Sequence, residues 1–202
     1  LAAQLAALNL YDLLKPIDDR LEIGPTRLLE KTGGHGNFRD QFTPKLKAAI
    51  LVASDSTAAG KRKDKSGALI RDRMSQEDVE VVAYDVLADD AAQIETWLKK
   101  KCGENVDLIL TTGGSGLGPR DITVEAARRV IEREIPGIAE AMRGHGRERT
   151  PYAMLSRGIC GVCGTTLILT LPGSSRGAEE SLDAVLPGLL HAFKMMRGGG
   201  HL

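Results

Sequence analysis

The sequence predicts an α/β domain with a mostly parallel, doubly wound sheet and helices on both of its faces. Two observations indicate this class, and the composition allows a chain of this length to fold as a globular domain. Short apolar runs alternate with segments of helical periodicity between residues 47 and 196, which is typical of parallel sheets with crossover helices. Several apolar runs end in loops of small, polar residues, as strands of such sheets do. The 202 residues are 42% hydrophobic, which is enough to bury a core.

The first half of the domain is expected to hold two strand–helix pairs. Residues 47–56 (KAAILVASDS) begin as an apolar run and end in a polar loop, which predicts a buried strand, and residues 66–74 predict a helix. Residues 79–87 (VEVVAYDVL) predict the second strand, and residues 89–103 a second helix. The apolar face of that helix consists of Ile94, Trp97 and Leu98. Gly103 stands where a glycine commonly ends a helix.

The second half repeats this order. Residues 106–112 (VDLILTT) predict a third strand, and residues 122–135 a helix. The helical spacing in that segment comes from Val124, Ala127, Val130 and Ile131. Residues 165–175 (TTLILTLPGSS) predict a fourth strand with its loop. A closing helix over residues 177–196 is expected to be bent or interrupted at Pro187.

Three of the predicted strands end in loops that suit an anion. These loops are residues 54–57 (SDST), 111–116 (TTGGSG) and 171–175 (LPGSS). Because the carboxyl ends of parallel strands meet at one edge of a sheet, we expect the loops to converge there. Their backbone N–H groups and hydroxyls, and the helix start that follows the glycines, favour negative charge. The sequence therefore predicts a ligand that bears phosphate.

The glycine-rich loop fits neither of the common phosphate-binding motifs. Gly113 and Gly118 have the spacing of a P-loop, but Pro119 and Arg120 stand where Lys and Ser or Thr should follow. The dinucleotide fingerprint is also absent, because the third glycine of GSGLG comes one residue early. A single glycine-rich turn is often only a tight connection between elements. The two companion loops are what favour a ligand site here.

Four longer stretches of this domain closely resemble the molybdopterin adenylyltransferase family, which includes the MogA and MoaB proteins of bacteria and the G domains of gephyrin-like proteins. They are TTGGSGLGPRDITVEA, IPGIAEAMR, MLSRGICG and LILTLPGSSRGAEESLDAVLPGLLHAF. The resemblance covers roughly residues 45–197. It implies a trimeric α/β enzyme of molybdenum cofactor biosynthesis. With Mg²⁺ and ATP, such an enzyme transfers AMP to the terminal phosphate of molybdopterin and releases pyrophosphate.

The resemblance also implies the residues of the site. Asp89 and Asp121 match the family's two functional aspartates, and their implied roles are to position Mg²⁺ and to activate the nucleotide. Asp90 is the alternative to Asp89, because the match could slip by one residue there. The residues that match the family's substrate-binding and nucleotide-binding motifs are Ser56, Asp64, Gly113, Gly114, Ser115, Gly116, Arg120, Ser156, Pro172, Gly173 and Ser174.

Several of these residues also have a purely structural interpretation. Asp121 precedes a predicted helix and would serve as its N-cap, and Asp89 and Asp90 likewise stand before a helix. Ser174 could simply form the turn before the last helix. The run KRKDK at residues 61–65 reads as a solvated surface. Two other functions stay open: a pterin-binding or scaffolding module with little catalysis, and another nucleotide-dependent member of the superfamily, such as the competence-damage-inducible proteins.

Residues 1–38 resemble the C-terminal end of another family of the same pathway, the cyclic pyranopterin monophosphate synthases (MoaC). The stretches ALNLYDLLKP and IGPTRLLEKTGG carry this resemblance, and it places Asp12 and Lys15 where that family has catalytic residues. The segment is too short to form such a domain. We expect a fusion with a synthase remnant at residues 1–38, a linker at 39–46 and the transferase domain at 47–202. The chain opens without methionine, so we expect the natural N-terminus upstream. The alternative is a linker helix.

Charge and cysteine content limit the partners and the compartment. Lys and Arg together number 27, as do Asp and Glu, so a nucleic acid is not an expected partner. Apolar runs fall well short of the ~20 residues that span a bilayer, so a membrane is not expected either. Three cysteines favour a reducing compartment, and we expect the protein in the cytoplasm. Cys160 and Cys163 form one C-x-x-C pair, which we interpret as two thiols rather than a zinc site.

Overall fold

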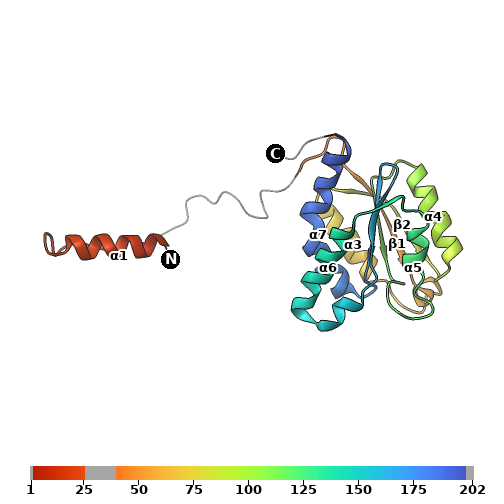
Figure 1. Ribbon diagram of the computed structural model, residues 1–202, viewed down its shortest axis with the longest axis horizontal. Coiled ribbons are helices and arrows are strands. Elements are labelled where there is room, and N and C mark those ends of the chain that lie inside the picture. Colours follow the sequence, from red (N-terminus) through yellow and green to blue (C-terminus); the bar gives the residue numbers. More distant parts are fainter. Residues whose placement is uncertain (1, 26–39, 199–202) are drawn as a thin grey trace. The chain divides into compact units, whose positions relative to one another are not determined.

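The computed structural model describes residues 2–25 and 40–198, and the chain divides into two compact units, Leu1–Asn37 and Phe38–Leu202. In the first unit, helix α1 (Ala2–Leu14) is followed by a short turn. The boundary expected at residue 38 and most of the stretch IGPTRLLEKTGG lie outside the described residues. The second unit contains the α/β domain (Figure 1).

A six-stranded sheet forms the centre of the second unit, with the order β2-β1-β3-β6-β5-β4. Its strands are β1 (Lys47–Ala53), β2 (Glu80–Leu87), β3 (Leu108–Thr112), β4 (Arg133–Glu134), β5 (Cys160–Cys163) and β6 (Thr166–Leu171). The first four strands in this order run parallel. At the other edge, β5 runs antiparallel to β6, and β4 runs antiparallel to β5. The sheet is therefore mostly parallel, which confirms the predicted fold class.

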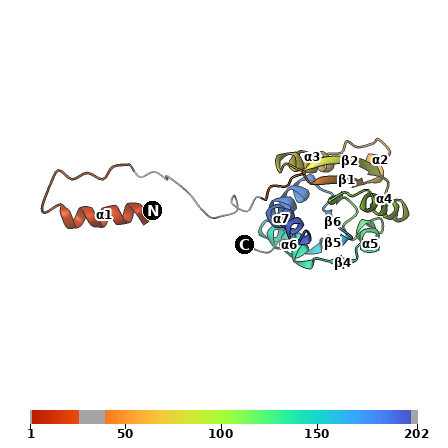
Figure 2. The same ribbon diagram turned by 90° about the horizontal axis from the view of Figure 1, so that it is seen from above.

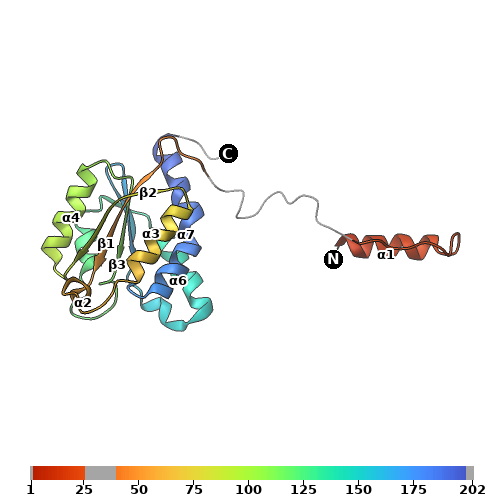
Figure 3. The same ribbon diagram turned by 180° about the vertical axis from the view of Figure 1, so that it is seen from behind.

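Helices cover both faces of the sheet, as seen from above in Figure 2 and from behind in Figure 3. One face carries α3 (Ser66–Gln76), α6 (Pro136–Arg149) and α7 (Ser175–Met196). The other carries α4 (Ala91–Gly103) and α5 (Thr123–Arg128). Because side chains alternate along a strand, β3 supplies both cores: Leu108 and Leu110 pack under α7, whereas Ile109 packs under α4 and α5.

Residues 40–46 pack against the domain before β1 begins. The rings of Phe42 and Phe193 meet edge to face with their centroids 6.4 Å apart, and Leu46 is almost completely buried. The carboxylate of Asp40 lies 2.6 Å from Nδ1 of His191 on α7. The segment that the sequence suggested as a linker therefore contributes to the core of the second unit.

The helix predicted over residues 122–135 was wrong in its length. Helix α5 ends at Arg128, and β4 follows at residues 133–134, where it pairs with β5. Val130 still packs in the core beneath α4 and α5, which explains the helical spacing in the sequence. Helix α6 and strands β4 and β5 were not predicted. A strand of two residues and its partner are specified by pairing across the sheet rather than by local pattern.

Helix α7 also differs from expectation, as does the conformation of the residues that follow helix α4. Helix α7 is continuous from Ser175 to Met196, so Pro187 does not interrupt it. Its buried side chains on the sheet, which include Leu182, Leu186 and Leu189, favour the helix on both sides of the proline. Helix α4 ends at Gly103 as predicted, but the residue in the left-handed conformation is Asn105, with φ of 55°.

Candidate active site

The three polar loops lie at the carboxyl ends of adjacent strands. Because β1, β3 and β6 are neighbours in the sheet, the loops that follow them share one edge. The hydroxyl of Thr112 donates a hydrogen bond to the carbonyl of Pro172 at 2.8 Å, which ties the second loop to the third. A Cβ added to Gly173 would lie only 3.1 Å from Cα of Gly113. The loops therefore form one surface, as the sequence predicted.

Two glycines of the central loop are required by backbone geometry. Gly113 and Gly114 have φ angles of 94° and 60°, in the left-handed region that favours glycine. A Cβ on Gly113 would overlap the carbonyl oxygen of Ala53, and a Cβ on Gly114 would overlap the hydroxyl of Thr123. Bare backbone at this point lets the chain turn sharply after β3, close to Ala53 of β1 and Thr123 of α5.

A cavity of about 450 Å³, here named the loop pocket, lies over these three loops. It is lined by three cationic side chains and two carboxylates: Arg62, Lys65, Arg120, Asp89 and Asp121. The first residues of α3 and α7 also line it, so two helix N-termini add partial positive charge. The loop pocket therefore combines groups that bind phosphate with carboxylates that can bind a divalent cation.

A second cavity of about 470 Å³, the helix pocket, opens next to the first. Its distinctive lining comes from α6, the 3₁₀ helix η2 (Pro151–Leu155) and the start of α7: Arg143, Arg149, Tyr152, Leu155, Ser156 and Glu180. Four residues line both cavities: Gly114, Asp121, Gly173 and Ser174. These shared residues form a wall between the two pockets, and Asp121 is the one charged side chain in that wall among the described residues.

Asp89 is held in the loop pocket by a reciprocal pair of hydrogen bonds. The backbone N–H of Asp55 donates to Oδ2 of Asp89 at 3.2 Å, and the N–H of Asp89 donates to Oδ1 of Asp55 at 3.1 Å. Asp55 also forms an ion pair with Arg120. Burial, with a contribution from the Asp55 charge, raises the pKa of Asp89 above its usual value. Asp55 was missed from the sequence, where its position in the SDST loop was the only signal.

Asp90 has a structural role instead. Its Oδ1 accepts hydrogen bonds from the N–H groups of Ala92 and Gln93 at 2.9 and 3.0 Å, which makes it the N-cap of α4. These hydrogen bonds lower the pKa of Asp90, with the one from Gln93 first. The structure thus separates the two adjacent aspartates that the sequence left as alternatives: Asp89 lines the pocket, and Asp90 caps the helix.

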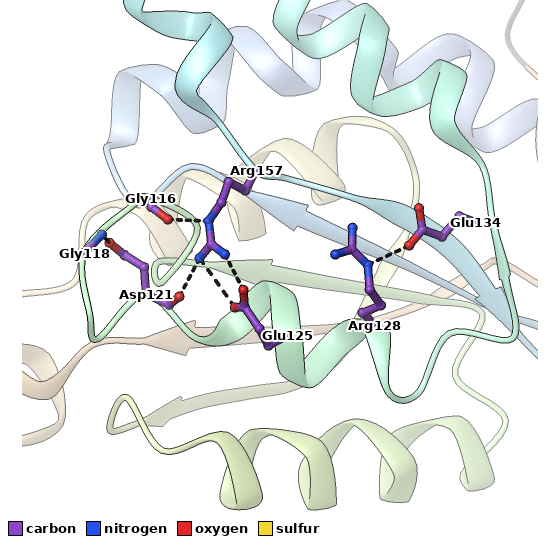
Figure 4. Close-up of polar contacts among 7 residues, drawn as sticks. All are labelled: Gly116, Gly118, Asp121, Glu125, Arg128, Glu134 and Arg157. Atoms are coloured by element: carbon purple, nitrogen blue, oxygen red, sulfur yellow. Dashed lines mark hydrogen bonds and ion pairs between the residues drawn. The ribbon is translucent and has the colours of Figure 1, made fainter.

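Asp121 does not act as the cap of α5 that the structural interpretation suggested. Helix α5 begins at Thr123 with Ile122 at the cap position. The carboxylate of Asp121 instead accepts a hydrogen bond from the N–H of Gly118 at 2.7 Å, which closes the glycine loop on itself (Figure 4). A Cβ at Gly116 or Gly118 would lie 2.9 Å from that carboxylate. The two glycines therefore leave room for Asp121 in the loop.

Three predicted serines line the pockets, although their hydroxyls bind the protein's own backbone. Ser115 is buried and donates to the carbonyl of Leu171 at 3.3 Å. Ser174 accepts a hydrogen bond from the N–H of Gly177 at 3.2 Å and so caps α7, and Ser156 accepts from the N–H of Gly158 at 3.4 Å. Pro172 and Gly116 line the helix pocket, and Gly113 and Arg120 line the loop pocket.

Two other predicted residues lie apart from both pockets. The hydroxyl of Ser56 lies 3.2 Å from that of Ser54 in the first loop, where it is Ser54 that lines the loop pocket. Asp64 accepts hydrogen bonds from the N–H of Gly67 at 3.0 Å and from the hydroxyl of Tyr84, and it lines a separate hollow beside α3. Burial, followed by the Asp64 contact, raises the pKa of Tyr84. Asp64 therefore organises the start of α3.

The described residues contain no group of three or more His, Cys, Asp or Glu side chains placed to hold a metal ion. Cys160 and Cys163 contribute to opposite sides of the sheet, because three positions along a strand reverse the face. Cys160 is buried, which raises the pKa of its thiol to about 12. Cys163 packs near Cys102 instead. The C-x-x-C pair thus cannot converge on one zinc ion.

In the first unit, Lys15 and Asp12 form an exposed ion pair with 3.0 Å between Nζ and Oδ1. The hydrogen bond with Asp12 raises the pKa of Lys15.

Across the two described segments, the helices are too short or too polar to traverse a lipid bilayer.

Comparison with known proteins gives a consistent set of relatives. Residues 49–191 match the family model described as "Probable molybdopterin binding domain". A molybdopterin adenylyltransferase of Helicobacter pylori J99 is 36% identical over 152 residues, covering 74% of this chain and 86% of the relative. The crystal structure of the molybdopterin biosynthesis enzyme MoaB from Thermus thermophilus is 47% identical with a TM-score of 0.72, covering 76% of this chain and 97% of the other.

Longer relatives also match the first unit. A "Molybdenum cofactor biosynthesis bifunctional protein" of Chlorobaculum tepidum is 38% identical over 200 residues, which is 99% of this chain. The chain spans 63% of that relative's length and 66% of a second bifunctional relative from Synechococcus elongatus. A CinA structure from Thermoplasma acidophilum, at 19% identity and a TM-score of 0.56, shares the fold alone.

Proposed function

The chain belongs to the family of probable molybdopterin-binding domains, and from this membership we propose that it transfers AMP from ATP to molybdopterin. In this reaction an oxygen of the pterin's terminal phosphate attacks the α-phosphorus of ATP. The bond between that phosphorus and the oxygen bridging to the β-phosphate breaks, and pyrophosphate leaves. The product is adenylyl-molybdopterin, an intermediate of molybdenum cofactor biosynthesis. Relatives named molybdopterin adenylyltransferase support the proposal.

The observation that carries this proposal is the pair of pockets that share a wall. Transfer between two phosphate-bearing substrates requires their reacting groups to meet, while the rest of each substrate is held separately. The loop pocket and the helix pocket are separate cavities with Gly114, Asp121, Gly173 and Ser174 in common. A phosphate from each side could therefore meet at this wall, next to the carboxylate of Asp121.

The loop pocket suits the triphosphate of ATP. Arg62, Lys65 and Arg120 supply positive charge, and the N-termini of α3 and α7 supply backbone N–H groups. Asp89 and Asp121 supply carboxylate oxygens, which Mg²⁺ prefers. Because two carboxylates do not complete an octahedral shell, phosphates and waters would provide the remaining ligands. When bound, Mg²⁺ would offset the negative charge that builds up during transfer.

The helix pocket suits the pterin. Tyr152 and Leu155 line it and are largely exposed, with 74% and 50% of their surface accessible, so they could pack on a planar ring. Arg143 donates one N–H to the carbonyl of Gly158 at 3.2 Å. Arg149 pairs with Glu180 at 2.5 Å. The two arginines add positive charge to the helix pocket, which would favour the terminal phosphate of the pterin.

Incubation with molybdopterin, ATP and Mg²⁺ tests the proposal. We expect adenylyl-molybdopterin and pyrophosphate in equal amounts, and no pyrophosphate when the pterin is left out. Tight binding of molybdopterin without any product would reject the enzymatic activity and favour a pterin-binding module of the same fold.

We further propose that the first unit derives from a cyclic pyranopterin monophosphate synthase within a fused protein. The alignment of two bifunctional relatives over 99% of this chain supports this origin. Asp12 and Lys15 would be the remaining synthase residues.

A homotrimer is proposed from the family resemblance. The cysteines of the described structure are free thiols, in keeping with the cytoplasmic location that we also propose.

A further inference from the structure

Arg157 makes an unusual set of contacts next to the candidate active site. It lies between η2 and β5, and its Nε donates to the carbonyl of Gly116 at 2.5 Å. Its Nη2 donates to the carbonyl of Asp121 at 2.5 Å, and the guanidinium also pairs with the carboxylate of Glu125 on α5 (Figure 4). Arg157, Glu125 and these two carbonyls are here named the Arg157 network. One planar cation therefore joins three separate points of the glycine loop and α5.

The two carbonyls stand at the two ends of the segment 116–121. Within that segment, Leu117 is 67% exposed and the Arg120 side chain 68% exposed, so core packing does little to hold it. Its internal hydrogen bonds run between Gly118 and Asp121, at 2.7 and 3.0 Å. These bonds close the loop on itself but do not connect it to the rest of the fold. The ion pair of Arg120 with Asp55 connects the segment to the first loop, and the Arg157 network connects both of its ends to the rest of the fold.

The chemistry of arginine suits this task. A guanidinium presents several N–H donors in a fixed plane, whereas the ammonium of lysine is a compact charge without that fork. Glu125 completes the geometry, and the hydrogen bond from Arg157 lowers the pKa of its carboxyl. Arg128, on the same helix, pairs with Glu134 at 2.8 Å rather than with the loop. It therefore offers a matched arginine outside the network.

We propose that Arg157 is a positioning residue for AMP transfer, which holds the segment 116–121 so that the Asp121 carboxylate stays in the wall between the two pockets. This inference rests on the proposed function. Arg157 lines neither the loop pocket nor the helix pocket but a third hollow, together with Arg143 and Cys160. It therefore acts on the reaction through the backbone of Asp121 rather than through contact with a substrate.

The first test needs no substrate. Hydrogen–deuterium exchange is measured on the full chain for the parent, Arg157→Gln, Glu125→Gln and the control Arg128→Gln. We expect peptides covering residues 113–121 to exchange about tenfold faster in Arg157→Gln and less so in Glu125→Gln, which retains both carbonyl contacts. Peptides from β1 and β3 should exchange as in the parent. Unchanged exchange of the loop in Arg157→Gln would overturn the proposal. If Arg157→Gln does not fold, Glu125→Gln decides instead: loop exchange faster than in the parent supports the proposal, and unchanged loop exchange overturns it.

The second test measures AMP transfer by the same variants and by Arg157→Lys. We expect Arg157→Gln to lower kcat at least tenfold while the KM values for ATP and molybdopterin change less than about threefold. Lysine should restore little of the loss, because it lacks the fork, and Arg128→Gln should match the parent. A loosened loop with normal kcat would overturn the positioning role. If the parent itself transfers no AMP, the proposed function fails, and the exchange experiment still reports separately whether Arg157 holds the loop.

Discussion

Replacement of Asp89 by Asn removes one negative charge from the loop pocket with little change in shape. The amide oxygen can still accept the hydrogen bond from the N–H of Asp55, which is now 3.2 Å long. If Asp89 helps to hold Mg²⁺ against the nucleotide, its neutralisation should lower the rate of AMP transfer on the order of 10²-fold. That factor corresponds to about 2.7 kcal/mol of lost transition-state stabilisation.

The stability of the Asp89→Asn protein, unlike its transfer rate, should stay the same or rise. Burial raises the pKa of Asp89 in the folded protein above its usual value of 3.8, so the folded state resists ionisation. Such a carboxyl contributes stability that is fully present below its unfolded pKa and is lost as the pH rises through its folded pKa. Asn does not titrate. The Tm of the variant should therefore equal or exceed that of the parent at pH 7, and the difference should shrink as the pH falls toward 3.8.

Asp90→Asn is the matched control, because it makes the same chemical change at the next residue. Asn caps helices about as well as Asp, and the exposed position should keep the change in stability within about 0.5 kcal/mol. For a domain of this size that is a Tm shift of about 2 °C or less. AMP transfer should stay within about twofold of the parent, because Asp90 caps α4 and the pocket is lined by Asp89.

The assay is the initial rate of pyrophosphate release with saturating Mg-ATP and molybdopterin, together with calorimetric Tm values across the pH range. Near-normal transfer by a folded Asp89→Asn protein would refute its catalytic role. An equal loss in both variants would show that the pocket responds only to total charge. A greater loss in Asp90→Asn would mean that the two aspartates had been assigned the wrong way round.

Two further predictions follow from the same geometry, and a third follows from the family resemblance. Asp121→Asn should keep the hydrogen bond from Gly118, so Tm should fall by no more than about 4 °C, while AMP transfer drops on the order of 10²-fold or more; a folded variant with normal transfer would leave Asp121 a purely structural role. Gly113→Ala should cost at least about 2 kcal/mol, because its Cβ would overlap the Ala53 carbonyl as well as strain the backbone. Gly60→Ala, with φ of 69° and open space around it, should cost only about half as much in thermal unfolding. Light scattering should give a mass about three times 21.6 kDa, and a stable monomer at micromolar concentration would contradict the trimer.

Local pattern was sufficient for most of the fold. Strands β1, β2, β3 and β6 are apolar runs bounded by polar loops, and α3, α4 and α7 follow helical periodicity, so each could be recognised from its own residues. The edge formed by β4 and β5 could not be recognised in this way. Val130 and Ile131 continue a helical spacing even though the chain has already left α5, because they pack in the core beneath it.

The sequence by itself determined the class of the fold and the convergence of the three polar loops at one edge of the sheet, because parallel strands bring their carboxyl ends together whatever the remaining contacts are. Asp121 and the glycines beside it were also expected at this edge, where they line the loop pocket, and their roles in the reaction stay predictions. Only the tertiary structure showed that Asp89 lines the loop pocket while Asp90 caps α4, since adjacent residues point in different directions and the partner of Asp89 lies 34 positions away, at Asp55. The same holds for Arg157, whose contacts lie 32 to 41 positions away along the chain. Hydrogen bonds over such separations depend on how the strands are ordered in the sheet, and no local pattern in the chain encodes that order.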